Sequence, residues 1–277
     1  MNGTTVTSPK RDATLPGSVD AHGRWLGQCL ALAEMELRKL LHDPTELLTR
    51  AVQPALWLLV FGEVFTRIRA IPTSNLRYLD FLAPGVLAQS VLFIAIFYGI
   101  AVIWERDLGL VHKLLVSPVS RAALVLGKAL SAGVRALSQA GLVYLLAWLL
   151  GVRMNWHPLA LLGVAATVLL GAGVFSTFSL VIACLVKTRE RFMGIGQILT
   201  MPLFFASNAM YPVTIMPDWL KVVARVNPLT YEVDVLRALM IQGGAAVGSL
   251  GADFAVLVLA LTALVAVCAR LYPTLAR

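Results

Sequence analysis

The sequence predicts an all-α polytopic membrane protein, and its composition, its hydropathy and the lengths of its apolar segments carry that prediction. Of the 277 residues, 58% are hydrophobic and 14% are charged, whereas about a quarter of the residues in a soluble domain are charged. The mean hydropathy is +0.80. Six windows reach or approach the roughly 20 apolar residues that a helix needs to cross a bilayer. The predicted spans are about 47–66, 81–103, 122–150, 158–186, 192–212 and 248–269.

The region before the first span is predicted to stay outside the hydrocarbon. Residues 1–23 are rich in Ser, Thr, Gly and Pro and lack the apolar core of a signal peptide, so we expect a disordered cytosolic tail. Residues 24–277 are predicted to form one transmembrane domain. From Arg24 to His42, apolar residues recur at three- and four-residue steps, which predicts an amphipathic helix in the membrane interface. The Asp43-Pro44 pair ends it, because proline disfavours helical geometry in the preceding residue.

The distribution of basic residues predicts that both termini are cytosolic. With the N-terminus inside, thirteen Lys and Arg residues fall on the cytosolic side and seven outside, and three lie in the tail or inside the third span. Basic residues accumulate on the cytosolic side of membrane proteins. The net charge of +8 therefore reports topology, and no basic run with interleaved aromatic residues indicates a nucleic-acid partner. The first span is the weakest, because Pro54 and Glu63 interrupt it.

The long link before the sixth span predicts two short external helices. Pro217 to Val226 is amphipathic, and its apolar stripe, which includes Trp219 and Leu220, is expected to enter the outer leaflet or to cap the exit path. The second helix is predicted from Thr230 to Met240, with Thr230 as its cap. Glu232 and Asp234 then fall in its first turn, where the helix dipole favours acidic residues.

No motif for catalysis or for a cofactor is present in the sequence. The chain lacks H-E-x-x-H, G-x-S-x-G and the phosphate-binding G-x-x-x-x-G-K-[ST], and its four histidines are scattered. Its three cysteines are far apart and predict neither a disulfide framework nor a zinc site. We therefore expect a non-enzymatic chain without metal or cofactor. Any uphill transport must draw on a partner or on an ion gradient.

Four ionisable residues fall inside the predicted spans or near their ends. Glu63, Lys128 and Asp253 are close enough to span ends to reach the interface. Arg135 lies deeper, and both a cavity and a carbonyl-rich neighbour fit it. A series of acids typical of a proton relay is absent, which weakens an ion-coupled mechanism.

A stripe of small residues in the fourth span predicts close helix packing. Gly163, Thr167 and Gly171 recur every four residues and so share one helix face. Small residues on one face let neighbouring helices approach closely in a membrane.

The segment after the second span concentrates charge in a chain that otherwise avoids it. If this segment is helical, Trp104, Leu108, Val111 and Leu115 share one face, and charged residues fill the rest. Two interpretations fit the pattern: a solvated loop against lipid headgroups, or a docking element whose apolar residues enter a groove of a cytosolic partner.

The order of several short motifs resembles the permease subunits of type-2 ABC exporters, a class that includes drug-resistance, polysaccharide and nodulation-factor permeases. The resemblance covers about Leu26 to Leu271. The motifs that carry it are Glu36-Leu-Arg38 with Asp43-Pro44; Glu105-Arg106 with Leu114 to Arg121 and Leu126-Gly-Lys128; Ser207 with Tyr211-Pro212 and Met216 to Leu220; and Asn227 to Tyr231 with Leu236-Arg237.

The resemblance implies a bacterial inner-membrane complex of two six-span permeases, alike or paralogous, with two separate ATPase subunits that bind the ATP. It also implies a coupling helix after the second span and external re-entrant helices before the sixth. The residues it assigns to the ATPase contact are Glu105, Arg106, Leu108, Val111 and Leu115, and those in the external helices are Trp219, Leu220 and Tyr231. One departure is Asn208, where such permeases often have Gly. This departure bears on the packing at the outer end of the fifth span.

The function implied by the resemblance is ATP-driven export of an amphipathic compound: a drug, lipid, glycolipid or polysaccharide. The alternative is an ion-coupled secondary transporter or channel, and a membrane-embedded enzyme or scaffold ranks third. No motif identifies the exported compound, since an apolar groove between helices needs none.

Overall fold

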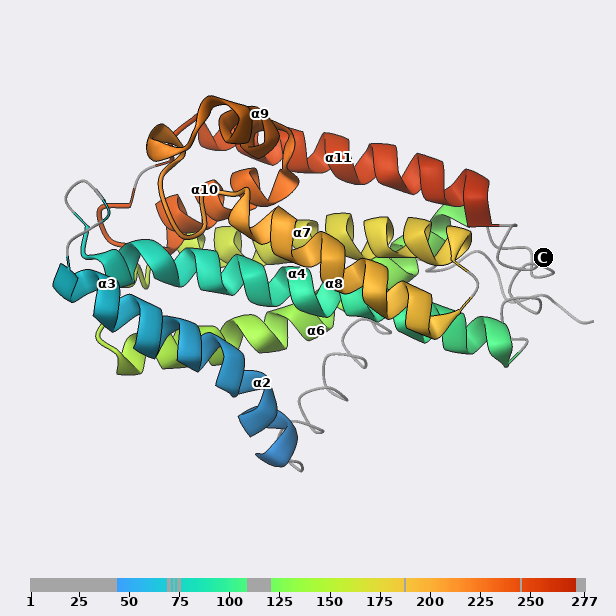
Figure 1. Ribbon diagram of the computed structural model, residues 1–277, viewed down its shortest axis with the longest axis horizontal. Helices are drawn as coiled ribbons and strands as arrows, with labels where there is room; N and C mark the ends of the chain where they lie inside the picture. Colours follow the sequence, from blue (N-terminus) through green and yellow to red (C-terminus); the bar gives the residue numbers. More distant parts are fainter. Residues whose placement is uncertain are drawn as a thin grey trace, which may run out of the picture.

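The computed structural model describes residues 44–68, 71, 73, 76–108, 121–186, 188–244 and 246–272, which form a bundle of helices (Figure 1). The described residues contain one isolated bridge, between Met154 and Ile241, and no strand. The predicted all-α class is therefore confirmed. The elements are α2 (Pro44–Leu56), η1 (Trp57–Gly62), α3 (Glu63–Ile68), α4 (Tyr78–Asp107), α6 (Arg121–Leu149), α7 (Pro158–Leu185), α8 (Arg189–Phe205), η2 (Val213–Ile215), α9 (Asp218–Val226), α10 (Pro228–Met240) and α11 (Leu250–Leu271).

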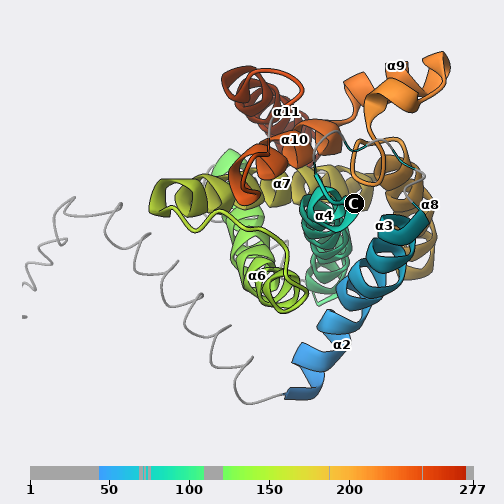
Figure 2. The same cartoon turned by 90° about the vertical axis from the view of Figure 1, so that its left-hand side faces the viewer.

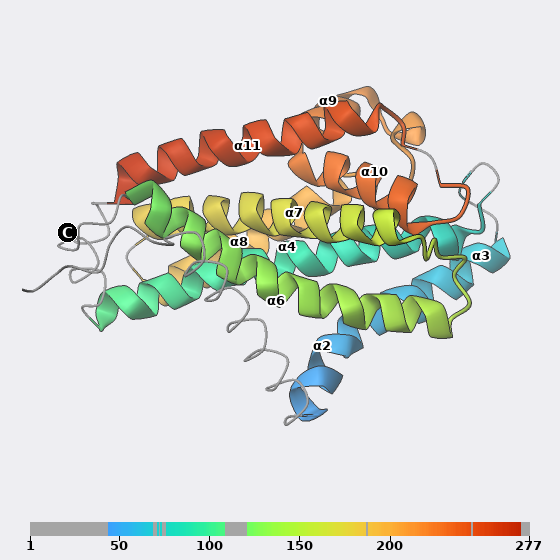
Figure 3. The ribbon, with the colours of Figure 1, turned by 180° about the vertical axis from the view of Figure 1, so that it is seen from behind.

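Helices α4 and α7 form the centre of the bundle, with the other long helices around them (Figure 2). α7 packs against α4, α6, α10 and α11. It is apolar on every side, as expected of a helix that is surrounded by protein. α11 contacts α7 and α10 on one side and leaves most of its surface exposed (Figure 3).

Five stretches within the described residues are long and apolar enough to cross a membrane, and the chain is a polytopic α-helical membrane protein. The five are 51–68, α4, 124–149, α7 and α11. α8 has 17 residues and begins with Arg189, Glu190 and Arg191, so the fifth predicted span, 192–212, stays a prediction. The predicted tail and interfacial helix lie in residues 1–43, outside the described part of the chain.

Two helices end at residues other than the predicted span ends. α4 continues to Asp107, four residues beyond the end of the predicted span, and its last turn contains Glu105, Arg106 and Asp107. α8 ends at Phe205 instead of 212. Pro202 lies near that end, and Asn227 Nδ2 donates to the oxygens of Leu203 and Ala206 at 2.6 and 3.2 Å. The last carbonyls of α8 are thus satisfied by a residue from the following link, and the chain turns there.

The small residues of α7 make the close contact that the sequence predicts. A Cβ on Gly163 would lie 2.7 Å from Leu239 of α10, and one on Gly171 would lie 2.3 Å from the Glu232 carboxyl group. Thr167 between them is fully buried. The stripe therefore lets α10 approach α7 along its length.

α10 packs against α7, α11 and α4. It begins at Pro228, and Asn227 is its cap, since the Asn227 side chain accepts a hydrogen bond from the Leu229 N–H at 3.0 Å. Thr230 lies inside the helix, so the predicted cap was wrong. Pro at the first position and Asn before it form a stronger start signal than Thr230.

The helices place two sets of connections at opposite ends of the bundle (Figure 1). The Asp107 end contains the end of α4 and the starts of α6 and α8, where Asp107, Arg121 and Arg189 lie. The Asp234 end contains α9, α10, the end of α8 and the start of α11. The link between α6 and α7 also lies at the Asp234 end, where the Asn155 N–H donates to Met240 oxygen at 2.7 Å.

Candidate functional site

Ion pairs join the ends of α4, α6 and α8 at the Asp107 end. Lys128 of α6 donates to Glu105 Oε2 of α4. Arg189 Nη2 of α8 lies 2.8 Å from Asp107 Oδ2. The Arg189 guanidinium carbon also lies 3.4 Å from the centre of the Trp104 ring, a cation–π contact. Displacement of one of these helix ends would therefore act on the other two.

Arg106 extends this network to the end of α7. Its Nη2 lies 3.2 Å from Asp107 Oδ1, and its Nη1 donates to the oxygen of Val186, just after α7, at 3.3 Å. Four helix ends are therefore linked through charged side chains of α4. Glu105 and Arg106, both predicted from sequence to couple the bundle to a partner, lie at its centre.

Beyond the ion pairs, the Asp107 end exposes apolar side chains. Trp104 is 51% exposed and Leu108 is 70% exposed, one helical turn further on. The Leu108 N–H still donates to Trp104 oxygen at 3.0 Å, so the chain leaves the helix only after Leu108. Val111 and Leu115, the other predicted members of this face, lie outside the described residues.

α9 presents the apolar stripe that the sequence predicts. Trp219 is 69% exposed and Leu220 is half-buried, whereas the buried side of the helix holds Ala224. Tyr231 of α10 donates its hydroxyl to the oxygen of Arg225 at 2.6 Å and so fixes α10 to α9. The exposed stripe suits contact with lipid or with another protein surface.

A buried polar cluster at the Asp234 end joins α10 to the segment after α8. Asn208 Nδ2 donates to Asp234 Oδ1 at 2.7 Å, and Arg237 Nη2 donates to Asn208 oxygen at 2.8 Å. Arg237 Nη1 lies 3.6 Å from Asp234 Oδ1, and its guanidinium carbon lies 3.8 Å from the centre of the Phe81 ring. Burial lowers the pKa of Arg237 to about 10, so Arg237 remains charged at neutral pH and compensates Asp234.

Asn208, the departure from the family pattern that bears on packing, therefore takes part in a buried hydrogen-bond network. Close packing is retained at the next residue: a Cβ on Gly85 of α4 would lie 2.3 Å from the backbone oxygen of Ala209. The Tyr78 hydroxyl donates to Met210 oxygen at 3.1 Å. The segment after α8 is thus held directly against α4.

Glu232 is fully buried, and neither of its carboxyl oxygens has a hydrogen-bond partner among the described residues. Its carboxyl group packs against Gly171 of α7. Burial raises the pKa of Glu232 well above its ordinary value. The sequence interpretation did not predict this burial, since it explained Glu232 only by the helix dipole in the first turn of a short external helix.

Two other ionisable residues predicted inside the membrane are less isolated than Glu232. Glu63 is more than half exposed and lies 4.0 Å from Arg67. The guanidinium carbon of Arg135 lies 5.6 Å from the centre of the Tyr98 ring of α4. This contact favours packing over a cavity for Arg135, with an aromatic ring as the neighbour.

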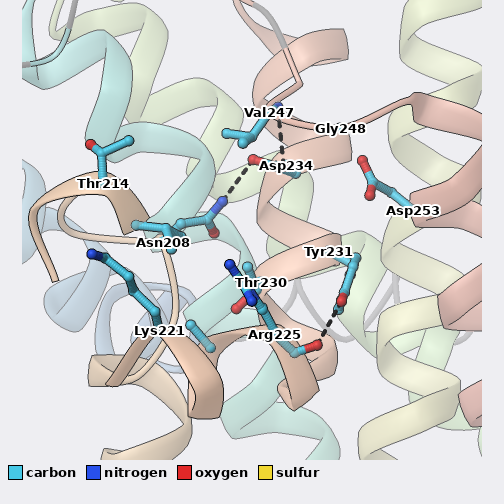
Figure 4. Close-up of a pocket in the computed structure, with 12 residues that line it drawn as sticks. Asn208, Thr214, Lys221, Arg225, Thr230, Tyr231, Asp234, Val247, Gly248 and Asp253 are labelled. Atoms are coloured by element: carbon cyan, nitrogen blue, oxygen red, sulfur yellow. Dashed lines mark hydrogen bonds between the residues drawn. The ribbon is translucent and has the colours of Figure 1, made fainter. Parts of the chain in front are cut away.

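A cavity of about 580 Å³ opens at the Asp234 end (Figure 4). It lies between α9, α10 and the start of α11, beside the buried polar cluster of Asn208, Asp234 and Arg237. No group of three or more His, Cys, Asp or Glu side chains within the described ranges could hold a metal ion. The residues that line the cavity are Asn208, Val213, Thr214, Lys221, Ala224, Arg225, Thr230, Tyr231, Asp234, Val247, Gly248 and Asp253.

The site thus combines a polytopic helical bundle, an ionic network at one end and a largely apolar cavity with polar side chains at the other. The ABC-2 type transporter family model matches residues 27–241, most of the chain. The chain belongs to the ABC-2 type transporter family. The resemblance inferred from the motifs is confirmed.

Three relatives show how broadly the similarity extends. The chain is 31% identical to a protein of Cyanophora paradoxa named as transport permease ycf38, over 71% of this chain and 68% of the relative. It is 27% identical to the daunorubicin resistance ABC transporter permease protein DrrB1 of Streptomyces coeruleorubidus, over 72% and 70%. It is 24% identical to a Mycobacterium tuberculosis protein named as doxorubicin resistance ABC transporter permease protein DrrC, over 83% and 82%. The chain is therefore a transmembrane component of an ABC transporter.

Proposed function

We propose that this chain is the permease subunit of an ATP-driven exporter of amphipathic compounds. In this proposal two permease chains, identical or paralogous, work with separate cytosolic ATPase subunits that bind and hydrolyse ATP. The proposal is supported by the family membership and by the absence of a phosphate-binding motif from the sequence. The names of relatives such as DrrB1, which refer to drug resistance, support an amphipathic cargo.

The Asp107 end is the proposed contact with the ATPase. The single observation that carries this assignment is the network in which Glu105, Arg106 and Asp107 connect the ends of four helices beside exposed Trp104 and Leu108. An ATPase that displaced one of these helix ends would act on the other three through these side chains. The same orientation places the basic starts of α6 and α8 in the cytosol, as the distribution of Lys and Arg favours. The membrane is then a bacterial inner membrane with both termini inside.

Replacement of Leu108 tests the contact. Leu108→Asp should reduce the ATPase recovered with affinity-tagged permease by at least about tenfold, because apolar anchors in an interface typically contribute a few kcal/mol. Leu159→Asp is the matched control, since Leu159 is 72% exposed at the opposite end of the bundle. Equal ATPase recovery with both variants would contradict the assignment.

Glu232 gives specific support to a second candidate, an ion-coupled carrier. A fully buried acid without a partner can take up and release a proton during transport. An ion-coupled carrier would lose transport in Glu232→Gln and after addition of a protonophore. The ATP-driven exporter should retain ATP-dependent transport in both cases, which separates the two candidates in one vesicle assay.

A further inference from the structure

The cavity at the Asp234 end has the size of a ligand site. Its volume of about 580 Å³ falls within the roughly 300–1,000 Å³ of pockets that hold small molecules. Val213, Ala224, Val247 and the ring of Tyr231 supply apolar wall, and the polar side chains come from α9, α10, α11 and the segment after α8 (Figure 4). Most of its occupant would therefore be apolar.

Two buried residues that line this cavity carry hydrogen-bond acceptors without partners. Asn208 is 1% exposed, and its amide nitrogen is bound to Asp234, but its Oδ1 has no partner among the described residues. Asp253 of α11 is 4% exposed, and its Oδ2 likewise has none. A buried acceptor without a partner destabilises the fold, and a charged one does so more strongly. A ligand that donates hydrogen bonds would remove that destabilisation.

The charges around the cavity favour a cationic donor near Asp253. Asp234 is compensated by Arg237 at 3.6 Å and accepts the Val247 N–H at 3.1 Å, whereas no ion pair to Asp253 occurs within the described part of the chain. The first turn of α11 accommodates the Asp253 carboxylate through the helix dipole but provides no donor to Oδ2.

The basic residues of the cavity lie on the α9 wall. Lys221 Nζ is 2.9 Å from Asp218 Oδ1, and Arg225 is exposed. The first of these charges is paired and the second is screened by water. A cation near Asp253 would meet a desolvated carboxylate, whereas an anion at the α9 wall would meet charges that are already paired or hydrated.

We propose that this cavity binds an amphipathic ammonium compound, whose N–H groups donate to Asp253 Oδ2 and Asn208 Oδ1 while its apolar body lies against Val213, Ala224 and Val247. A protonated primary amine has three donors, enough for both acceptors. The inference deepens the proposed export function and rests on it only for the direction of transport. Binding itself is measured without ATP.

The test uses the intact permease–ATPase complex in lipid nanodiscs and dansyl probes that share one apolar body. Monodansylcadaverine ends in an ammonium group, and the comparison probes end in a methyl group or in a carboxylate. The ammonium probe should bind most tightly. Asp253→Asn should weaken its binding at least about tenfold, because removal of one member of a buried charge pair has a large effect on affinity.

Two further variants keep the outcome decisive. Glu63→Gln removes the same charge from the exposed start of α3, outside the cavity lining, and should change the affinity by less than about twofold. Thr214→Trp fills the cavity from its exposed rim with Asp253 in place, and should also weaken the ammonium probe. If Asp253→Asn does not assemble, as judged by gel filtration, Thr214→Trp decides the outcome.

Three results would overturn the proposal: tighter binding of the carboxylate probe, unchanged affinity in assembled Asp253→Asn, or unchanged affinity in Thr214→Trp. Binding that follows the predicted order without ATP-dependent movement of the probe would contradict the export function and leave the cavity assignment intact. If the three probes do not bind in the predicted order of affinity but the complex exports another compound, the cavity assignment is contradicted and the export function is retained.

Discussion

The two ends of the bundle differ in how much charge they bury. At the Asp107 end, Glu105 pairs with Lys128, whose side chain is 11% exposed, and Asp107 pairs with Arg189, and these two side chains are 39% and 33% exposed. At the Asp234 end, Glu232, Asp234 and Asp253 are buried, and Arg237 is the buried cation among the described residues there. Exposed ion pairs form and separate at a cost of about 0–1 kcal/mol, whereas breaking a buried pair costs about 3–5 kcal/mol.

This difference indicates that the helix ends at the Asp107 end can rearrange, whereas the Asp234 end keeps a fixed arrangement. Water can replace a lost partner at the Asp107 end, so the helix ends there can shift relative to each other. At the Asp234 end, Asn208 and Asn227 fix the segment between α8 and α10 through hydrogen bonds to side chains and backbone. The ligand cavity inferred above lies at that fixed end.

The largest expected effect follows from removing the buried cation. Arg237→Met leaves Asp234 buried beside Asn208 without its ion pair, so the free energy of unfolding should fall by about 3–5 kcal/mol. Thermal unfolding monitored by size-exclusion chromatography measures the loss. The double variant Asp234→Asn with Arg237→Met should recover part of it. If Arg237→Met unfolds at the wild-type temperature, the Asp234 end is not the fixed one.

A smaller effect is expected from added bulk at the same end. Gly85→Ala places a methyl group 2.3 Å from the backbone oxygen of Ala209, which cannot move aside as a flexible side chain would. Overpacking of this kind costs about 1–3 kcal/mol. Gly127→Ala near the start of α6 is the control, because nothing lies within 4 Å of its added Cβ. Gly127→Ala should stabilise the helix by up to about 1 kcal/mol. Equal destabilisation by Gly85→Ala and Gly127→Ala would contradict the close packing of Gly85 against Ala209.

The smallest effect concerns the pH dependence of Glu232. Because burial raises the pKa of Glu232, the folded protein keeps a proton that the unfolded chain has lost, so folding stability decreases as pH rises above the ordinary Glu range. Glu232→Gln should remove this decrease and stabilise the protein at pH 7 by at least about 1 kcal/mol, with no gain at pH 4. Asp107→Asn, which loses exposed pairs, should instead destabilise by about 0–1 kcal/mol. A gain for Glu232→Gln that does not change with pH would contradict a neutral buried acid.

The helices were predictable because their signal is local. Apolar length identified α4, α6, α7 and α11, and the spacing of Gly163, Thr167 and Gly171 predicted the close contact that α10 occupies. The sequence showed that Asn208 departs from the family pattern. It could not show the hydrogen bond from Asn208 to Asp234, because the two residues are 26 positions apart.

The burial of Glu232 could not be predicted from its neighbours. A short segment with Glu232, Asp234 and Arg237 has the composition of an exposed helix, and only the return of α10 to α7 buries it. The end of α8 depends in the same way on Asn227, 24 residues after Leu203. In both cases the deciding contact comes from a distant segment, which the local pattern does not contain.

The most direct test of the two-ended account is the number of cargo molecules exported per ATP hydrolysed by the permease–ATPase complex in proteoliposomes. Glu105→Gln breaks the pair with Lys128 that links α4 to α6, whereas Glu63→Gln breaks an exposed pair with Arg67 at the other end. Glu105→Gln should assemble and hydrolyse ATP but export several-fold fewer molecules per ATP. Glu63→Gln should export as many molecules per ATP as the wild type. An unchanged ratio in Glu105→Gln would contradict the two-ended account.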